Sequence, residues 1–421
     1  MVRTLALALA LASTGAMVCV AGALAAPAPT RVVVGQDLAR QPIALASIGP
    51  DAIGVVQHNT IARLSPDGVL AILPPRGEVV WQDDAVPLAG DLLSGGGGWV
   101  IELTDGQRLR GRPGASGDPE IVSWVELPGL APLKLELPIE RVRLIARSAT
   151  ARPAATSVDD RVETANGDVL LGFVASVGSA VEVELDNGVA ALELGLISRI
   201  DLANPAMQGT QPMVWLVDGS VLAAERFVEA SSGRLAFELA VEPAAGAPPR
   251  RGPRIDVPIG SVAAIELEPG RLVSLVATSE VESGSGTSMS SERRWTPAAR
   301  LGDPARAPLG LADIELPGPM EIRAELPAAA DRFWTEAVLA KPSAWSDATL
   351  VVELERSRGQ RDELARVDLS RDRRAGVIAV DLDAIGVART LVVRLESGAR
   401  GPIRDRVILR QPALSLTPAA P

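Results

Sequence analysis

The chain has 421 residues, with 41 lysine and arginine residues against 52 aspartate and glutamate residues, and a formal net charge of −11. This acidic balance excludes recognition of nucleic acid through neutralised phosphates, which requires a basic surface. A single cysteine excludes an intramolecular disulfide and any site that needs several cysteine ligands.

The first 25 residues are typical of a cleaved export signal. A basic residue near the start is followed by an apolar run from Leu5 to Ala21, and Ala23-Leu24-Ala25 fits the small-residue rule for signal peptidase. An uncleaved anchor is the alternative, but the run is rich in alanine and ends at a cleavage site. We therefore expect cleavage between Ala25 and Ala26, loss of the cysteine, and a mature protein in the periplasm or at the cell surface with no transmembrane segment.

A hairpin motif recurs three times along the next part of the chain. Each copy has an apolar or alternating run, then Asp or Asn before a glycine, then a leucine three places later. The glycines are Gly106, Gly167 and Gly219, and glycine accepts the positive φ that such turns demand. Because the apolar side chains on both arms must share one face, the loop has an odd number of residues. We expect a three-residue loop that ends at the glycine.

A second motif closes each copy. Apolar residues step by two, three and three positions, which predicts a strand, one helical turn and a short strand. The three copies of this spacing begin at Leu137, Leu192 and Val257. A hairpin followed by this closing motif resembles small barrels of the SH3-like or Sm-like type. Self-similarity of this kind indicates an array of repeats.

These motifs and the composition between them divide the chain into domains. The predicted boundaries are a signal peptide at 1–25, an N-terminal β segment at 31–92, small β-barrel repeats at 98–148, 161–203 and 212–278, a linker at 279–294 and a β-sandwich at 295–416. The sequence leaves open whether 31–92 holds a degraded fourth repeat. The predicted fold class is all-β, with tandem small β-barrel repeats before a C-terminal sandwich of the jelly-roll type.

The C-terminal region resembles the carbohydrate-binding module family called NPCBM, a galactose-binding-like jelly roll often attached to glycosidases. The resemblance depends on Arg332-Phe333, on the paired runs around Ile378 and Leu391, and on the closing run from Asp405 to Leu414. The family's early Gly-x-His-Ala signature is represented only by Gly310-Leu311-Ala312, and its late tryptophan is a leucine here. The resemblance therefore implies the fold more than sugar binding.

Few residues offer chemistry. His58 is the only histidine and no nucleophile–base set is evident, so we expect no enzyme activity and no cofactor. We assign no metal site: Asp381 and Asp383 alternate on one strand face, but no loop supplies the further oxygen ligands that calcium needs, and the sequence leaves calcium binding open. In jelly-roll modules of the resembled family, ligands sit among loops at one end. This implies a glycan site formed by Trp345 and Asp347 in one loop and by Arg404 and Asp405 before the last strand, where the ring offers an apolar face and the charged groups bind hydroxyls. A tryptophan that only covers the sandwich edge is the alternative for Trp345.

The sequence thus predicts an exported, non-catalytic binding protein that holds a glycan on its C-terminal sandwich. The alternative is a structural or assembly component of the cell envelope, whose repeats contact envelope proteins through exposed sheet edges. The expected partners are a glycan or an envelope protein, and not nucleic acid. An exposed Trp345 beside Asp347 and an arginine would favour glycan binding, whereas a filled, convex sandwich surface would favour assembly.

Overall fold

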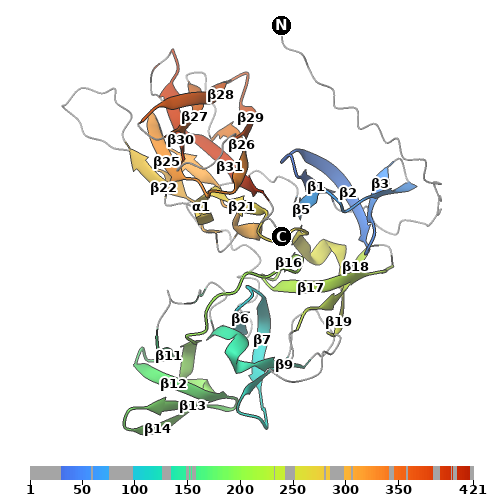
Figure 1. Ribbon diagram of the computed structural model, residues 1–421, viewed down its shortest axis with the longest axis vertical. Coiled ribbons are helices and arrows are strands. Elements are labelled where there is room, and N and C mark those ends of the chain that lie inside the picture. The colour runs from blue at the N-terminus through green and yellow to red at the C-terminus, as the bar shows by residue number, and fades with distance from the viewer. Residues whose placement is uncertain are drawn as a thin grey trace.

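The computed structural model describes most of the chain between residues 30 and 417. The gaps in the described range are 58–59, 75–97, 126–133, 148–150, 152, 154–157, 232, 242–251, 279–280, 285–297, 305–306, 341–345, 357–358, 383–388, 400 and 402–404. The predicted signal and its cleavage site at Ala25 and Ala26, His58, Trp345 and Arg404 therefore lie outside the described residues. The described part is all-β, and its one α-helix, α1 (Leu275–Thr278), has a single turn. Figure 1 shows four small β units and a larger sandwich.

The four units, named A to D in chain order, contain five strands each. Unit A consists of β1 (Thr30–Gly35), β2 (Arg40–Ile48), β3 (Ile53–Gln57), β4 (Thr60–Leu64) and β5 (Val69–Leu73). Unit B consists of β6 (Trp99–Leu103), β7 (Arg108–Gly114), β8 (Ile121–Val125), β9 (Leu135–Pro138) and β10 (Val142–Ala146). Unit C consists of β11 (Asp160–Thr164), β12 (Val169–Val177), β13 (Ala180–Leu185), β14 (Gly188–Glu193) and β15 (Ile197–Asp201). Unit D consists of β16 (Met213–Leu216), β17 (Val221–Val228), β18 (Arg234–Leu239), β19 (Arg254–Pro258) and β20 (Val262–Glu266).

All four units share one topology. The first four strands form a meander, and the last strand returns to pair with the first, always antiparallel. In units B, C and D a 3-10 turn of three residues separates the fourth strand from the fifth, as the closing motif predicts. These turns are η2 (Ile139–Arg141), η3 (Leu194–Leu196) and η4 (Ile259–Ser261).

The opening hairpins have the expected parity. Ile101 lies opposite Leu109, and the N–H of Leu103 donates to the carbonyl of Gln107 at 2.8 Å, which leaves a three-residue loop ending at Gly106. The φ angles of the three hairpin glycines are +87°, +93° and +88° in chain order. This is the left-handed backbone that glycine adopts without strain.

Unit A repeats the closing motif in a form that the sequence hides. Leu64, Pro66, Val69 and Ile72 keep the steps of two, three and three, with a proline at the second apolar position. The N–H of Val69 donates to the carbonyl of Pro66 at 3.0 Å, and in unit B the residue after the turn bonds to the carbonyl of Ile139 in the same way. The N-terminal segment therefore has the same topology as the three predicted repeats.

The prediction of small barrels needs correction, because no described unit closes. In unit B, for example, β9 and β10 flank the 3-10 turn but do not pair with each other. The turn carries β10 across to β6, while β7 pairs with β6 through Arg108–Gly111 and with β8 through Arg112–Gly114. Each unit is a curled sheet whose two end strands remain apart.

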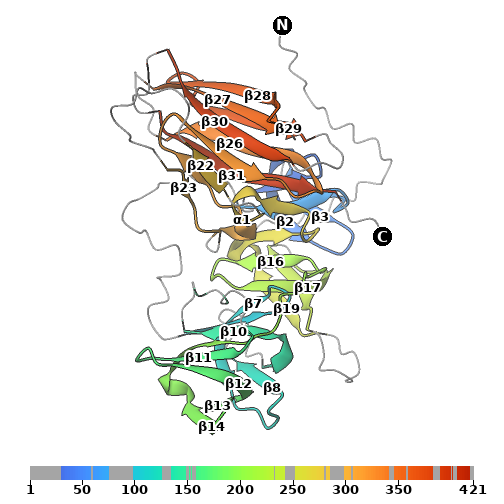
Figure 2. The same cartoon turned by 60° about the vertical axis from the view of Figure 1, so that its left-hand side comes forward.

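The units are joined by pairing of equivalent strands. The last strands of B and C pair with Ile145 opposite Ile200, and the last strands of A and D pair with Ile265 opposite Ile72. The second strands of B and D meet where Val221 lies opposite Arg108. The order in space is therefore C–B–D–A and differs from the order in the chain. In Figure 2 the array extends away from the sandwich and ends at unit C.

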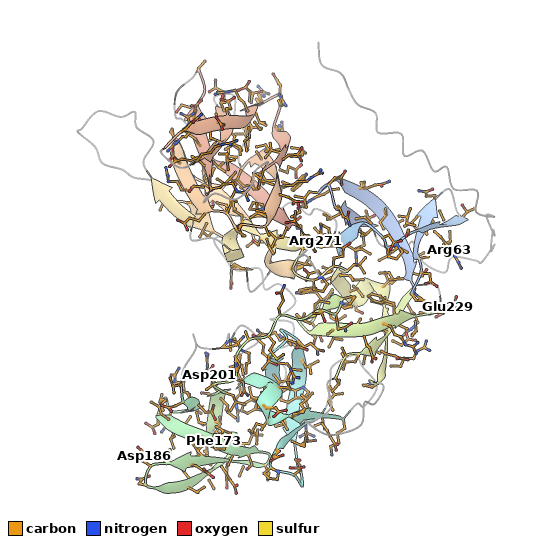
Figure 3. The ribbon with its side chains drawn as sticks, viewed as in Figure 1. Arg63, Phe173, Asp186, Asp201, Glu229 and Arg271 are labelled. Atoms are coloured by element: carbon orange, nitrogen blue, oxygen red, sulfur yellow. The ribbon has the colours of Figure 1, made fainter. Side chains whose placement is uncertain are left out.

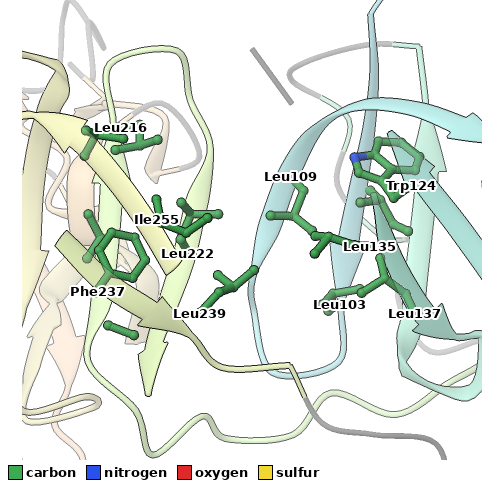
Figure 4. Close-up of a cluster of buried hydrophobic side chains, with 14 of the residues drawn as sticks. Leu103, Leu109, Trp124, Leu135, Leu137, Leu216, Leu222, Phe237, Leu239 and Ile255 are labelled. Atoms are coloured by element: carbon green, nitrogen blue, oxygen red, sulfur yellow. The ribbon is translucent and has the colours of Figure 1, made fainter. Parts of the chain in front are cut away.

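One hydrophobic cluster runs through all four units. Figure 4 shows its part at the contact of B and D, where Leu109 of unit B lies toward Leu222 and Leu239 of unit D. These three side chains are at most 1% exposed. The open sides of the two curled sheets thus bury each other.

The C-terminal domain is a sandwich of two antiparallel sheets. The first sheet contains β21 (Leu272–Ser274), β23 (Arg300–Leu301), β24 (Ile314–Leu316), β26 (Ala330–Leu339), β29 (Ala375–Asp381) and β31 (Val407–Leu416). The second contains β22 (Val281–Gly284), β25 (Met320–Glu325), β27 (Asp347–Glu355), β28 (Arg361–Ser370) and β30 (Thr390–Ser397). The inner faces share one core that includes Phe333, Leu350, Ile378, Val393 and Leu409.

The sandwich starts earlier than the predicted boundary at 295. Leu272 to Ser274 pair with β31, and Val281 to Gly284 pair with β25. The segment 212–278 therefore ends inside the sandwich, and the predicted linker at 279–294 contains an edge strand. These two strands are only three and four residues long, so their alternation is too short to mark them in the sequence.

Hydrophobic contact fixes the sandwich to the A–D pair. A separate cluster joins Val34 and Leu70 of unit A and Ala264 of unit D to Trp334 and Ala413 on the outer face of the first sheet. Phe333 points into the sandwich core while its neighbour Trp334 lies in this outer cluster, as strand alternation predicts.

The hairpin glycines provide a stability test. A Cβ atom on Gly167 would meet nothing within 4 Å, so the cost of Gly167→Val is that of forcing a β-branched residue to positive φ. We expect the free energy of unfolding to fall by about 1 kcal/mol or more. Gly195→Val is the control, because position 195 is equally open and its φ is not positive. Equal losses in denaturant titrations of the two variants would contradict the turn assignment.

Candidate functional site

The structure brings together two of the four predicted glycan-site residues. Asp347 is the first residue of β27, and Asp405 comes shortly before β31. Their carboxyl groups are close enough to interact electrostatically. The carboxyl group of Asp347 also lies over Gly398, where a Cβ atom would collide with it. The other two predicted residues, Trp345 and Arg404, lie outside the described residues.

Asp405 is buried, which the loop-site hypothesis did not foresee. The residue is 1% exposed, and among the described residues no hydrogen-bond donor satisfies either of its carboxyl oxygens. Burial raises the pKa of Asp405 to about 7, and the negative charge of Asp347 adds to the rise. The backbone N–H of Asp347 opposes the rise without making a well-directed hydrogen bond. Asp405 thus lies beneath the surface of the loop end, and Asp347, which is half-buried, is the more accessible of the two.

A groove lies elsewhere, between unit A and the sandwich. It has a volume of about 430 Å³. One wall is the β1–β2 hairpin of unit A, with Asp37 and Arg40, and the other is the outer face of β26 and β29. Arg332 and Asp381 stand on that face with Val377, which is 55% exposed. Opposite charges therefore flank a floor that is partly apolar.

Arg40 fixes the wall that unit A contributes. Its guanidinium carbon lies 3.4 Å from the centroid of the Trp334 ring, a cation–π contact, and both terminal nitrogens donate to Gln411. Gln411 has a φ of +43°, and its N–H donates to the carboxylate of Asp313 at 2.8 Å. This strained backbone lies where the register between β26 and β31 shifts, and it directs the Gln411 carbonyl toward Arg40.

An ion pair crosses the other wall. Arg332 Nε lies 3.1 Å from a carboxylate oxygen of Asp381 on the neighbouring strand. The side chains are 39% and 66% exposed, so both present polar atoms to solvent. Trp334 is only 3% exposed, because Arg40 covers it. The groove can therefore receive a polar ligand through charge-assisted hydrogen bonds, but not through stacking on this ring.

Only one wall of this groove could be predicted from the sequence. Alternation along β26 places Arg332 and Trp334 on one face, and the structure shows that this is the outer face. Nothing local indicated that the hairpin at Asp37 and Arg40 lies against it. Among the described residues, no group of three or more His, Cys, Asp or Glu side chains is arranged to hold a metal ion. No helix in the described part of the chain is long and apolar enough to cross a membrane.

Comparison with known proteins assigns no family. No protein-family model matches the chain, and no curated protein matches it. Among solved structures, a CBM51 module from Clostridium perfringens GH95, in complex with methyl-galactose, is similar at a TM-score of 0.26 and 12% identity, over 34% of this chain and 99% of that one. The xylan-binding CBM22-1 domain of Paenibacillus barcinonensis Xyn10C is similar at a TM-score of 0.23 and 15% identity, over 35% of this chain and 94% of that one.

A larger protein of another kind gives similar values. The mosquito-larvicidal Cry4Aa toxin of Bacillus thuringiensis is similar at a TM-score of 0.24 and 9% identity, over 76% of this chain and 52% of that one. Carbohydrate-binding modules are thus among the structural neighbours, but TM-scores this low identify neither a family nor a ligand.

Asp405 makes the stability of the sandwich depend on pH. Its pKa is about 7 in the folded protein against an ordinary 3.8, so between these values the folded state holds a proton that the unfolded state has released. The stabilising contribution is complete below pH 4 and is lost as pH rises through 7. Asp405→Asn remains neutral, and we expect it to exceed the wild type by about 4 kcal/mol in unfolding free energy at pH 8 and to equal it near pH 4.

Denaturant titrations across this pH range measure the difference. Asp362→Asn is the control, because that carboxylate is 39% exposed in an ion pair with Arg356. Parallel pH profiles for wild type and Asp405→Asn would show that Asp405 is charged in the folded protein at neutral pH.

Proposed function

We propose that the chain is an exported, non-catalytic binding protein that holds a carbohydrate in the groove between unit A and the C-terminal sandwich. The observation that supports this best is the lining of that groove. A carboxylate and a guanidinium on one wall, Asp381 and Arg332, lie beside the exposed aliphatic side chain of Val377. Sugars present the same combination, hydroxyl groups around apolar C–H surfaces. Pockets of roughly 300–1,000 Å³ suit small ligands.

The other outer face of the sandwich is less suited to a ligand. On the second sheet, Arg361 Nη1 lies 2.8 Å from Glu321 and its Nε 2.9 Å from Glu355, while Arg394 lies 2.9 Å from Glu353. The carboxylates of Glu321, Glu353 and Glu355 are only 11–18% exposed, against 66% for Asp381, so they present less oxygen surface to a sugar. This difference between the faces favours the groove.

The proposal that the protein is not an enzyme rests on the same residues. The described side chains that line the groove include no serine, cysteine or histidine that could act as a nucleophile or its base. Export is proposed from the N-terminal signal alone. The groove lies on the sandwich predicted to bind sugar, but on a sheet face and not among the loops.

A binding measurement tests the groove. A glycan array with the full mature chain identifies a saccharide, and calorimetry then compares variants. We expect Asp381→Ala to weaken binding by about tenfold or more, since a hydrogen bond to a charged group contributes about 1.5–3 kcal/mol. Asp362→Ala is the matched control, because it removes an ion pair of similar exposure from the other sheet.

The same titrations separate the groove from the loop end. If Trp345→Ala weakens binding and Asp381→Ala does not, the glycan binds at the loop end near Asp347. If no saccharide binds the wild type, the carbohydrate function is wrong. The alternative, an assembly component of the envelope, would then be the better proposal, and the exposed apolar surface of unit C favours it.

A further inference from the structure

Unit C exposes apolar side chains along its second strand. In β12, Val169, Leu171 and Phe173 alternate on one face and are 45%, 57% and 62% exposed. We call these three residues the unit C stripe. Val189 of β14, 68% exposed, extends it, because Phe173 and Val189 both lie opposite Glu184 of β13. Phe173 lies on the unit at the end of the array, away from the sandwich (Figure 3).

The equivalent strands of units B and D are covered by each other. Leu109 and Leu222, each three places after its hairpin glycine, are 1% and 0% exposed. Val221 pairs with Arg108, and the side chain of Gln107 accepts from the N–H of Ala223 at 3.0 Å. In unit C the second strand contacts β8 of unit B but pairs with no strand of another described unit, and its equivalent leucine, Leu170, is only partly buried.

The opposite end of the array carries polar residues at these positions. In each unit one apolar residue of the first strand faces the equivalent residue of the second strand, and that second-strand residue is Gln41 in unit A and Leu170 in unit C. The segment 40–42 of unit A therefore corresponds to the segment 169–171 of unit C. Gln41 and Pro42 are exposed, and Arg40 is held on Trp334. A proline and polar side chains protect a strand edge against pairing. Of these two ends, as far as the structure describes them, the unit C end is the apolar one.

We propose that the unit C stripe is the interface with a second copy of this chain, in which the two β12 strands run antiparallel about a two-fold axis near Val169. Every strand pairing between the described units joins equivalent strands, last with last in B–C and A–D, and second with second in B–D. Along the array, pairing of last strands alternates with pairing of second strands. Beyond unit C the next pairing would therefore join β12 to the second strand of another unit. A second copy supplies one, and a two-fold interface uses the same patch on both partners.

The charges around the stripe predict a salt dependence that distinguishes a dimer from a complex with a basic partner. Val169 lies opposite Glu163 and Phe173 opposite Glu184, while Arg161, opposite Leu171, pairs with Glu163 at 3.0 Å, so these bordering residues keep a net negative charge. Two such surfaces repel at low ionic strength, and salt screens the repulsion. A dimer of this kind therefore tightens as salt is added, whereas a basic partner would bind less tightly.

Sedimentation velocity on the full mature chain tests the proposal. We expect a concentration-dependent dimer whose dissociation constant rises about 100-fold in Val169→Glu and in Val169→Lys, because each variant places like charges together at the axis. Mixing the two variants brings opposite charges together and restores a dimer. Leu301→Lys, at an equally exposed position (45%) on the sandwich, is the control and leaves the dimer unchanged.

Circular dichroism and thermal melting verify that the variants fold, and Val169→Lys faces Glu163 within its own unit. A wild type that stays monomeric at every salt concentration would overturn the proposal. A dimer that survives in both variants, or that fails to return on mixing, would place the interface elsewhere. None of these outcomes depends on glycan binding.

Discussion

Pairing between the last strands of units that are distant in the chain is the contact on which the rest of the structure depends. Ile72 lies opposite Ile265, and both are 1% exposed. This contact joins unit A to unit D. The chain therefore passes through units B and C before it returns to unit A. Burial of two isoleucines contributes about 3–6 kcal/mol, enough to fix the register of a short ladder. The same pairing, Ile145 opposite Ile200, joins B to C.

The groove is a consequence of that pairing. The A–D pair presents Val34, Leu70 and Ala264 to the outer face of the first sandwich sheet, and Trp334 packs among them. Arg40 then covers the Trp334 ring and binds Gln411, which fixes the hairpin that forms one wall. A groove built in this way needs no long loops. Unit A forms one of its walls, so the repeats are part of the candidate site and not only a support for the sandwich.

The sequence predicted the local features, which are the hairpins and turns, but not the pairing between strands that are far apart in the chain. Glycines such as Gly106 and the closing steps after Leu137 determine each hairpin and turn within a few residues, so three units were recognised. The sequence leaves the assignment of unit A open, because Pro66 and Gln41 replace apolar residues of the pattern. Pairing between units could not be deduced, since all last strands carry the same apolar pattern. For the site, a family resemblance placed Asp347 near Asp405, but burial of Asp405 and the approach of Arg40 depend on tertiary packing.

Cross-linking measures the A–D contact most directly. The only cysteine lies in the predicted signal, so Ala71→Cys with Glu266→Cys, which are opposite each other in the ladder, gives a mature chain with two thiols. Opposed residues of an antiparallel pair are close enough for a disulfide. Oxidation should link these two, as peptide mapping under non-reducing conditions would show. Asp201 holds the position of Glu266 in unit C, and Ala71→Cys with Asp201→Cys should stay unlinked. A link in the second variant and none in the first would contradict the order C–B–D–A.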